Sequence, residues 1–316
     1  MADCCKLPMI CLSIVIVNWN VRDLLRNCLR SVYASWRAEP SALEVFVVDN
    51  ASNDDSAAMV RAEFPQAVLI ENRQNTGFTE ANNQAIDLAQ GQYVLLLNPD
   101  TEVLGDALNA MVDYLDVHPE VGLLGPKLLN PNRTVQSSRR RFPTLATAFL
   151  ESTVLQQWWP DNKVLRHYYV LDRSDDDVLP VDWVVGACLA VRRAAIDQVG
   201  LLDEGFFMYS EEMDWCYRLK KAGWQVVYLP TAQVIHSGGQ SSRQVVAAQH
   251  IHFQRSKIRF FHNHRGAMPA LLLRGFLLTT YVYQLIVESL KWLVGHKRPL
   301  RAERIRAYSQ VVRSGL

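Results

Sequence analysis

The sequence lacks the cysteine pattern of a zinc site. Its six cysteines include no Cys-x-x-Cys pair, and no group of Cys and His has the spacing of zinc ligands. We therefore expect reduced cysteines in a cytosolic protein. The chain also lacks an excess of charge, because 33 basic and 32 acidic side chains leave a formal net charge of +1. This balance gives no support to nucleic-acid binding.

Two signatures of other protein classes are missing as well. No Gly-x-Gly-x-x-Gly follows the first predicted strand, so the usual dinucleotide-binding pattern is absent. The apolar run at residues 7–17 is not followed by an A-x-A-like cleavage site, and we interpret it as the first strand rather than as a leader. With 49% hydrophobic and 21% charged residues, the chain is expected to bury a large core.

The first half of the chain contains a regular alternation of apolar strands and amphipathic helices. Four apolar runs end in polar residues, and these are LSIVIVN, LEVFVVD, AVLIEN and QYVLLLN. This order predicts an α/β fold with a mostly parallel sheet covered by helices. The second half is less regular, with a glycine-broken strand in VDWVVGACLAVRR and a strand pair in QVVYLPTAQVIH.

Polar side chains follow three of the predicted strands. Asn18 and Asn20 follow the first strand, Asp49 ends the second, and Asn98 and Asp100 follow the fourth. Because ligands of parallel sheets bind at the carboxyl ends of the strands, we expect these groups to form one site. Asn98-Pro99-Asp100 alone is ordinary turn chemistry, and its companions make it a candidate metal or phosphate site.

Three carboxylates lie within four residues at the start of a predicted helix, namely Glu211, Glu212 and Asp214. The helix N-terminus stabilises their ionised forms, while crowding is expected to raise the pKa of at least one of them. A carboxylate of this kind can act as a general base. The alternative is a solvated acidic helix start, with Asp214 paired to Arg218 one turn later.

Seven segments in this order resemble the family 2 glycosyltransferases with a GT-A fold. They are IVIVNWN, VVDNASND, NTGFTEANNQAI, LLLNPDT, VDWVVGACLAVRR, FFMYSEEMDWCYRLKKAGW and VIHSGGQS. The resemblance covers about residues 12–242 and is greatest to bacterial enzymes that add rhamnose or a similar sugar to cell-envelope polysaccharide intermediates. It implies a Rossmann-like central sheet flanked by helices, and inverting transfer of a sugar from a nucleoside diphosphate to a saccharide acceptor.

The resemblance also implies roles for single residues. Asp100 and His236 are the expected ligands of Mg²⁺ or Mn²⁺, which both accept oxygen and imidazole donors. Glu212 occupies the position of the family's catalytic base. The family usually has glutamate followed by aspartate there, so Glu211 remains a rival and Asp214 a third candidate. The expected nucleotide-binding residues are Asn18, Asn20, Asp49, Asn75, Gly77, Asn83, Asn98 and Arg140, and those on the acceptor side are Trp183 and Gly186.

Structural interpretations of several of these residues stay open. Asp49 is also a suitable helix cap. Trp183 is also an ordinary core residue, and His236 an ordinary satisfied histidine. Arg140 belongs to a basic run at residues 139–141, which suits either a diphosphate or a solvated loop.

The C-terminal part of the chain departs from the α/β pattern. We predict a catalytic domain at residues 1–245 and a helical, membrane-associating region at 246–316. The uncharged stretch between Arg274 and Glu288 is shorter than the roughly 20 residues needed to span a bilayer. A polar stripe and several aromatics at helical spacing favour a helix in the membrane interface. The residues concerned are Thr280, Gln284, Glu288, Lys291, Tyr281, Tyr283 and Trp292.

This pattern predicts a peripheral protein at the cytoplasmic, inner face of the cell membrane, acting on a polyprenyl-diphosphate-linked acceptor. A helix packed on the catalytic domain or in a homodimer interface is the alternative. Two other function classes also remain. A nucleotidyltransferase could use Asp100, although VNWNVRD lacks the Gly-rich loop expected after its first strand. A non-catalytic nucleotide-sugar-binding protein could keep the same fold.

Overall fold

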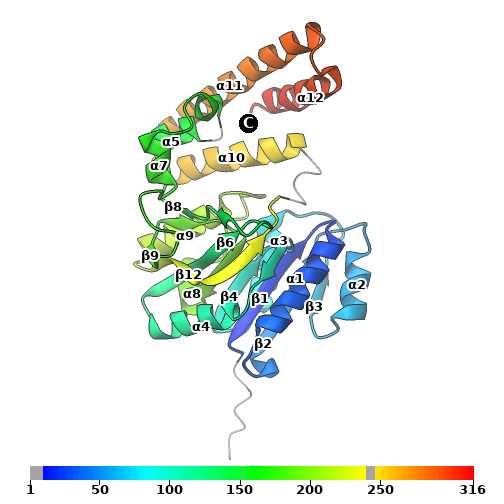
Figure 1. Ribbon diagram of the computed structural model, residues 1–316, viewed down its shortest axis with the longest axis vertical. Coiled ribbons are helices and arrows are strands. Elements are labelled where there is room, and N and C mark those ends of the chain that lie inside the picture. The colour runs from blue at the N-terminus through cyan, green and yellow to red at the C-terminus, as the bar shows by residue number, and fades with distance from the viewer. Residues whose placement is uncertain (1–9, 152, 240–245) are drawn as a thin grey trace, which may run out of the picture. The chain divides into compact units, whose positions relative to one another are not determined.

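The computed structural model describes residues 10–151, 153–239 and 246–316 (Figure 1). Residues 7–9 of the predicted first strand, Cys4, Cys5, and the final Gln-Ser of VIHSGGQS lie outside this range. The chain forms two compact units. The first consists of Met1–Arg141, Arg173–Gly205 and Glu211–Ser241, and the second of Phe142–Asp172, Phe206–Ser210 and Ser242–Leu316. The division into domains at residue 245 stays a prediction.

The first unit is built on a sheet whose first four strands are parallel, as predicted. Their order is β3-β2-β1-β4. The strands are β1 (Leu12–Asn18), β2 (Leu43–Asp49), β3 (Val68–Glu71) and β4 (Tyr93–Leu97). The helices between them are α1 (Arg22–Ser35), η1 (Pro40–Ala42), α2 (Ser56–Glu63) and α3 (Phe78–Leu88).

The rest of the sheet is mixed, which differs from a mostly parallel arrangement. β11 runs antiparallel to both β4 and β6, β12 is parallel to β6, and β5 is antiparallel to β12. These strands are β5 (Thr101–Val103), β6 (Val121–Leu129), β11 (Cys188–Arg192) and β12 (Gln225–His236). The predicted strand pair in QVVYLPTAQVIH is a single strand, β12, with a register shift between Leu229 and Gln233. Pro230 lies in this interval and has no N–H to donate, which explains the irregularity.

Short strands and further helices complete the first unit. The helices are α4 (Ala107–Val117), α8 (Arg193–Val199) and α9 (Glu211–Lys221), and the strands are β7 (Val135–Gln136), β8 (Arg139–Arg140), β9 (Leu179–Pro180) and β10 (Trp183–Val184). The glycine-broken strand of the sequence thus becomes β10 and β11. This arrangement of strands and covering helices agrees with the predicted α/β fold class.

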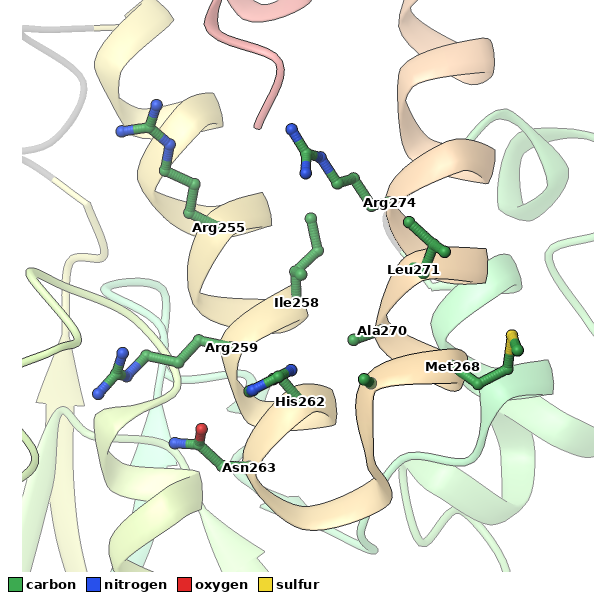
Figure 2. Close-up of a pocket in the computed structure, with 10 residues that line it drawn as sticks. Arg255, Ile258, Arg259, His262, Asn263, Met268, Ala270, Leu271 and Arg274 are labelled. Carbon is green, nitrogen blue, oxygen red and sulfur yellow. The ribbon is translucent and has the colours of Figure 1, made fainter.

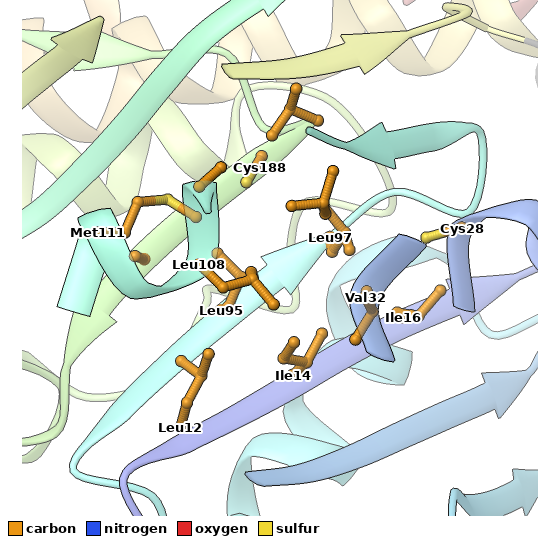
Figure 3. Close-up of a cluster of buried hydrophobic side chains, with 14 of the residues drawn as sticks. Leu12, Ile14, Ile16, Cys28, Val32, Leu95, Leu97, Leu108, Met111 and Cys188 are labelled. Atoms are coloured by element: carbon orange, nitrogen blue, oxygen red, sulfur yellow. The ribbon is translucent and has the colours of Figure 1, made fainter. Parts of the chain in front are cut away.

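The core lies between the sheet and its helices. Every residue of β1 is buried, because helices cover both faces of a central strand. Figure 3 shows Ile14 of β1 and Leu95 of β4 on the same face, near Val32 of α1 and Leu108 of α4. Full burial of one such side chain stabilises the fold by about 1.5–3 kcal/mol. The strand ends that carry the polar residues are therefore held in place by a well-packed sheet.

The second unit is helical. Its helices are α5 (Leu145–Leu150), α6 (Val154–Trp158), α7 (Lys163–Tyr168), α10 (Val246–Arg265), α11 (Ala267–Leu293) and α12 (Arg298–Ser314). α11 packs against α10 and α12. Within the described ranges it is the one helix long and apolar enough, by length and composition, to cross a membrane, although 28% of its most apolar window is buried.

Two polar residues of α11, Thr280 and Glu288, are buried against the other helices of the second unit, whereas Lys291 of the predicted stripe is exposed. Glu288 is 6% exposed and forms a 2.7 Å ion pair with Arg301 of α12, which is 8% exposed. Thr280 is buried as well. The opposite side exposes apolar residues that include Leu271, Leu272, Val282, Ile286, Leu290 and Leu293. This arrangement is the reverse of a helix on a water-exposed surface, where polar groups face outward.

Candidate active site

The carboxyl ends of β1 and β2 hold a buried polar pair at two of the predicted nucleotide positions. Asn18 Nδ2 donates to Asp49 Oδ1 at 3.0 Å and to Ser52 Oγ at 3.1 Å. The backbone N–H of Ser52 donates to Asp49 Oδ2 at 3.0 Å. Asn20 accepts from the backbone N–H of Asn53 at 2.7 Å. Asp49 is thus fixed by the loop after β2, and it does not cap α2, whose N-cap residue is Asp55.

The NTG loop is tied to the same edge of the sheet by Asn50, which the sequence analysis did not select. Asn50 Nδ2 donates to Asn75 Oδ1 at 2.9 Å and to the carbonyl oxygen of Gly77 at 3.0 Å. Gly77 has φ 91°, a conformation that favours glycine. The position of Asn50, directly after a strand-ending aspartate, was the available signal. Asn50 therefore places Asn75 and Gly77 beside the end of β2.

Asn83, which is predicted to bind the nucleotide, contacts the loop after α8. Its Nδ2 donates to the carbonyl oxygen of Leu202 at 3.0 Å, and its Oδ1 accepts from the N–H of Leu202 at 3.2 Å. Nδ2 also lies 3.1 Å from Glu204 Oε1. Both ends of this amide hold α3 to the loop after α8, so the described contacts of Asn83 are structural.

The two predicted metal ligands lie next to each other. Asp100 Oδ1 is 3.4 Å from His236 Nε2, and the two residues are 7% and 8% exposed. The antiparallel pairing of β5 with β12 sets Thr101 opposite His236. The N–H of Ser237 donates to the carbonyl oxygen of Asp100 at 2.9 Å. Backbone pairing thus brings together residues that are 136 positions apart in the sequence.

Gln136 orients the imidazole of His236. Gln136 Oε1 lies 2.7 Å from His236 Nδ1, and Gln136 Nε2 donates to Asn130 Oδ1 at 3.0 Å and to the carbonyl oxygen of His236 at 3.2 Å. Because Nε2 of this amide serves two acceptors, its Oε1 must accept from Nδ1–H. In the neutral imidazole, Nε2 of His236 then carries a lone pair, and this nitrogen faces Asp100 and lies 3.5 Å from Asn98 Nδ2.

The donor set fits a divalent cation that takes its other ligands from a bound diphosphate and water. A carboxylate oxygen and an imidazole lone pair face each other in a buried position, and a second polar group orients the imidazole, as is usual for metal-binding histidines. Within the described ranges, no group of three or more His, Cys, Asp or Glu side chains could hold a metal by itself. A cation at this position would therefore find only part of its coordination shell in the described protein groups.

The acidic start of α9 is largely buried, which excludes the alternative of a fully solvated helix start. Glu211 is 4% exposed. Within the described part of the chain, Oε2 of Glu211 and Oε2 of Glu212 have no hydrogen-bond partner. Burial raises the pKa of Glu211 well above its ordinary value, and the charge of Glu212 raises it further. Burial also raises the pKa of Glu212, partly offset by the N–H of Gly186 and the charge of Arg140. The predicted direction is correct, and burial is its main cause.

The three carboxylates of this segment differ in their partners. Asp214 Oδ2 accepts from Arg218 Nε at 2.8 Å, and Arg218 also donates to the carbonyl oxygens of Val199 and Leu201. Asp214 is thus part of a structural ion pair, one of the two alternatives left open by the sequence. Glu212 Oε1 instead lies 3.4 Å from the N–H of Gly186, in the predicted acceptor segment.

Gly186 links the acidic helix start to the metal pair. A Cβ added at Gly186 would lie 3.5 Å from three carbons of Glu212, so the two residues are in contact. The next residue, Ala187, accepts from the N–H of Asn98 at 2.9 Å. Asn98 in turn lies beside His236. The predicted base and metal ligands are therefore connected through one short segment at the edge of the sheet.

Trp183 and Arg140 lie together on the small β8–β10 sheet. Trp183 pairs with Arg140, is 8% exposed and donates from Nε1 to the carbonyl oxygen of Arg141 at 3.0 Å. The guanidinium carbon of Arg140 is 5.9 Å from the centre of the indole ring. The neighbouring Arg139 pairs with Asp175 at 2.8 Å. Within the basic run, Arg139 is thus structural, and Arg140 is the arginine whose charge acts on Glu212.

Comparison with known proteins gives consistent results. Residues 13–200 match the family model described as Glycosyl transferase family 2. The chain is 32% identical over 254 residues to the N-acetylglucosaminyl-diphospho-decaprenol L-rhamnosyltransferase of Mycobacterium tuberculosis, covering 76% of this chain and 81% of that protein. It is 27% identical to the rhamnosyltransferase WbbL of Escherichia coli, over 53% of this chain and 63% of the relative.

The fold is also similar to solved structures. A mannosyltransferase from Pyrobaculum calidifontis, in complex with GDP-Man and Mn²⁺, superposes with a TM-score of 0.54 at 15% identity. The match covers 95% of this chain and 86% of that one. This likeness supports the GT-A architecture.

Proposed function

The chain belongs to glycosyl transferase family 2, and we propose that it catalyses an inverting, metal-dependent transfer of rhamnose to a lipid-linked saccharide in cell-envelope synthesis. The family assignment makes it a nucleotide-sugar-dependent glycosyltransferase. One observation carries the mechanistic proposal. The carboxylate of Glu212 contacts Gly186, and the next residue is bonded to Asn98 beside the Asp100–His236 pair.

Glu212 is proposed as the general base. Its carboxylate takes the proton of the acceptor hydroxyl while that oxygen forms a bond to the anomeric carbon. The bond from the anomeric carbon to the phosphate oxygen breaks at the same time, and the nucleoside diphosphate leaves with the electron pair. Attack from the face opposite the leaving group inverts the anomeric configuration. A raised pKa makes Glu212 a stronger base than an exposed glutamate.

Asp100 and His236 are proposed to hold Mg²⁺ or Mn²⁺. Such a cation, when bound, neutralises negative charge on the departing diphosphate. The chain's own contribution is orientation, because Gln136 fixes the imidazole tautomer and the β5–β12 pairing fixes the carboxylate. Asn18 and Asp49 are proposed to bind the nucleoside, since their buried amide and carboxylate offer directional hydrogen bonds.

The acceptor is proposed to be an N-acetylglucosaminyl-diphospho-polyprenol, by analogy with the name of the Mycobacterium tuberculosis relative. α11 supports a location at the cytoplasmic membrane face, because its exposed side is apolar while Thr280 and Glu288 are buried. We propose that this helix lies in the interface. Deletion of residues 267–316 should then shift the protein from membranes to the soluble fraction. An unchanged distribution would contradict the membrane proposal.

A product assay tests the reaction. The purified chain is incubated with UDP-, dTDP- and GDP-sugars, Mn²⁺ and an N-acetylglucosaminyl-diphospho-lipid. We expect transfer of one sugar from one donor, seen by mass spectrometry, with inversion at the anomeric carbon by NMR and loss of activity in EDTA. Nucleotide binding without transfer or hydrolysis would identify a binding module instead. Retained configuration would refute direct displacement assisted by Glu212.

A further inference from the structure

The second unit contains a cavity of about 550 Å³ lined by residues of α10 and α11 (Figure 2). Its charged lining is entirely basic within the described part of the chain, and consists of Arg255, Arg259, His262 and Arg274. Figure 2 shows Arg274 reaching from α11 toward α10. A volume of this size suits a small ligand, and the charge selects an anion.

Two arginines of the cavity, Arg255 and Arg274, are not neutralised by nearby carboxylates. Within the described residues, neither Arg255 nor Arg274 has a carboxylate oxygen within 4 Å. Arg274 Nε donates to the carbonyl oxygen of Gly315 at 2.8 Å. Arg259 stacks over the ring of Phe206 at 5.2 Å. Two full positive charges thus remain available to a ligand at the cavity.

The first turn of α11 forms another part of the cavity lining. Ala267 and Met268 are the first two residues of this 27-residue helix and lie in the cavity wall. Gly266 precedes them with φ 95°, and no described side chain caps the helix. The leading amides of a long helix attract anions, and phosphate groups in particular. This feature supports the same ligand class as the arginines.

The remaining lining is apolar and continues onto the exposed side of α11. Met268 and Leu271 line the cavity and are 67% and 63% exposed. The exposed apolar surface extends along the same helix through Leu272 to Ile286 and Leu290. A hydrophilic anion such as a nucleotide would gain nothing from this surface. An anion attached to a long hydrocarbon chain would contact both the basic lining of the cavity and the apolar surface of α11.

We infer that this cavity binds the diphosphate of the lipid-linked acceptor, with the adjoining hydrocarbon on Met268, Leu271 and the apolar side of α11. The inference rests on the proposed function and names the part of the acceptor that the helical unit recognises. The arginines and the helix N-terminus hold the diphosphate oxygens. The membrane-facing residues hold the start of the polyprenyl chain.

Calorimetric titration of the full chain with farnesyl diphosphate tests the inference. Inorganic pyrophosphate and farnesol serve as the head-only and tail-only probes. We expect farnesyl diphosphate to bind more tightly than either. The double variant Arg255→Gln/Arg274→Gln should bind farnesyl diphosphate more weakly, by about tenfold per arginine, because each arginine loses a charge-assisted hydrogen bond to the ligand. Arg306→Gln, an exposed arginine of α12 outside the cavity, should leave binding unchanged.

Two neighbouring leucines of α11 provide a matched control for the tail. Leu271 lines the cavity, whereas Leu272 is 54% exposed and does not. Leu271→Gln should weaken farnesyl diphosphate binding and leave pyrophosphate binding unchanged, while Leu272→Gln should weaken farnesyl diphosphate binding by a clearly smaller factor, because Leu272 lies outside the cavity. If farnesyl diphosphate binds equally well to the wild type and to the arginine double variant, the inference is refuted. Equal effects of the two leucine changes on this probe would refute it as well.

Two measurements keep the test valid if a variant folds poorly. A photoreactive farnesyl diphosphate analogue on the wild-type chain should label peptides of α10 and α11, and labelling confined to other segments would overturn the inference. Failure of the transferase proposal would appear as no sugar transfer with any acceptor. Failure of the cavity inference alone would leave transfer intact, with an unchanged KM for the lipid acceptor in the arginine double variant.

Discussion

The exchange Glu212→Gln tests the proposed base while changing little else. It replaces one carboxylate oxygen by an amide nitrogen and keeps the side-chain length. The Gly186 N–H lies 3.4 Å from Glu212 Oε1, which is a long and weak hydrogen bond, and the backbone amides of Glu212 and Met213 also stabilise this carboxylate. Loss or weakening of the hydrogen bond from Gly186 should therefore change the local structure little. Donor affinity should therefore be preserved, because the predicted nucleotide residues Asn18 and Asp49 are untouched.

Turnover should fall strongly in this variant. General-base catalysis contributes about 10²–10⁴-fold to the rate, which corresponds to roughly 3–5 kcal/mol of transition-state stabilisation. We expect kcat to fall by that factor in the product assay, with the Kd for the donor nucleotide unchanged. Glu211→Gln is the matched control, since it makes the same chemical change one residue away.

The stability of the same variant separates catalysis from unfolding. Burial raises the folded-state pKa of Glu212 above its ordinary value of 4.5. The folded protein therefore binds this proton more tightly than the unfolded chain, and the resulting stabilisation is lost as pH rises through the raised pKa. Glutamine cannot ionise, so Tm at pH 8 should equal or exceed that of the wild type. Near pH 4 the two should agree.

Two results would refute this assignment. If Glu212→Gln keeps near wild-type kcat while Glu211→Gln loses it, the base is Glu211. If Glu212→Gln lowers kcat together with Tm at pH 8, the loss reflects damage to the fold.

Three further outcomes are expected. Gln136→Leu should weaken Mn²⁺-dependent nucleotide binding by about 10–100-fold, because His236 loses the group that fixes its tautomer; an unchanged Mn²⁺ titration would contradict this role. Glu211→Gln should raise Tm at pH 8 and have no effect below pH 4.5, since burial raises the pKa of this carboxyl in the fold; thermal melts across pH decide it. Arg301→Met should destabilise the helical unit by about 3 kcal/mol, measured by urea unfolding, because Glu288 loses its closest buried partner. The double variant Arg301→Met/Glu288→Leu should regain this stability. An unchanged unfolding curve for Arg301→Met would show that the ion pair contributes nothing.

The sequence alone was sufficient for the family and the fold class. Apolar runs that end in polar residues predicted parallel strands, and this order predicted that Asn18, Asp49 and Asn98 lie at one edge of the sheet. These predictions rest on local periodicity and on ordered motifs, which a single chain displays directly. The polar stripe of α11 was visible too, although its direction was not.

Other features depend on contacts between distant segments. Antiparallel pairing of β5 with β12 brings His236 to Asp100, and Gln136 reaches the same imidazole from β7. Asn83 matched a family motif, yet its amide holds Leu202.

Burial decided the remaining questions, because neither desolvation nor the direction of a side chain can be read from spacing. Glu211 and Glu212 look alike in the sequence, and only the packing of α9 sets Glu212 against Gly186. The tertiary structure likewise turned Glu288 of α11 inward to Arg301 and left leucines such as Leu271 and Leu290 exposed. A sequence lists which groups a helix carries, whereas the packed structure determines which of them meet solvent, a partner or a ligand.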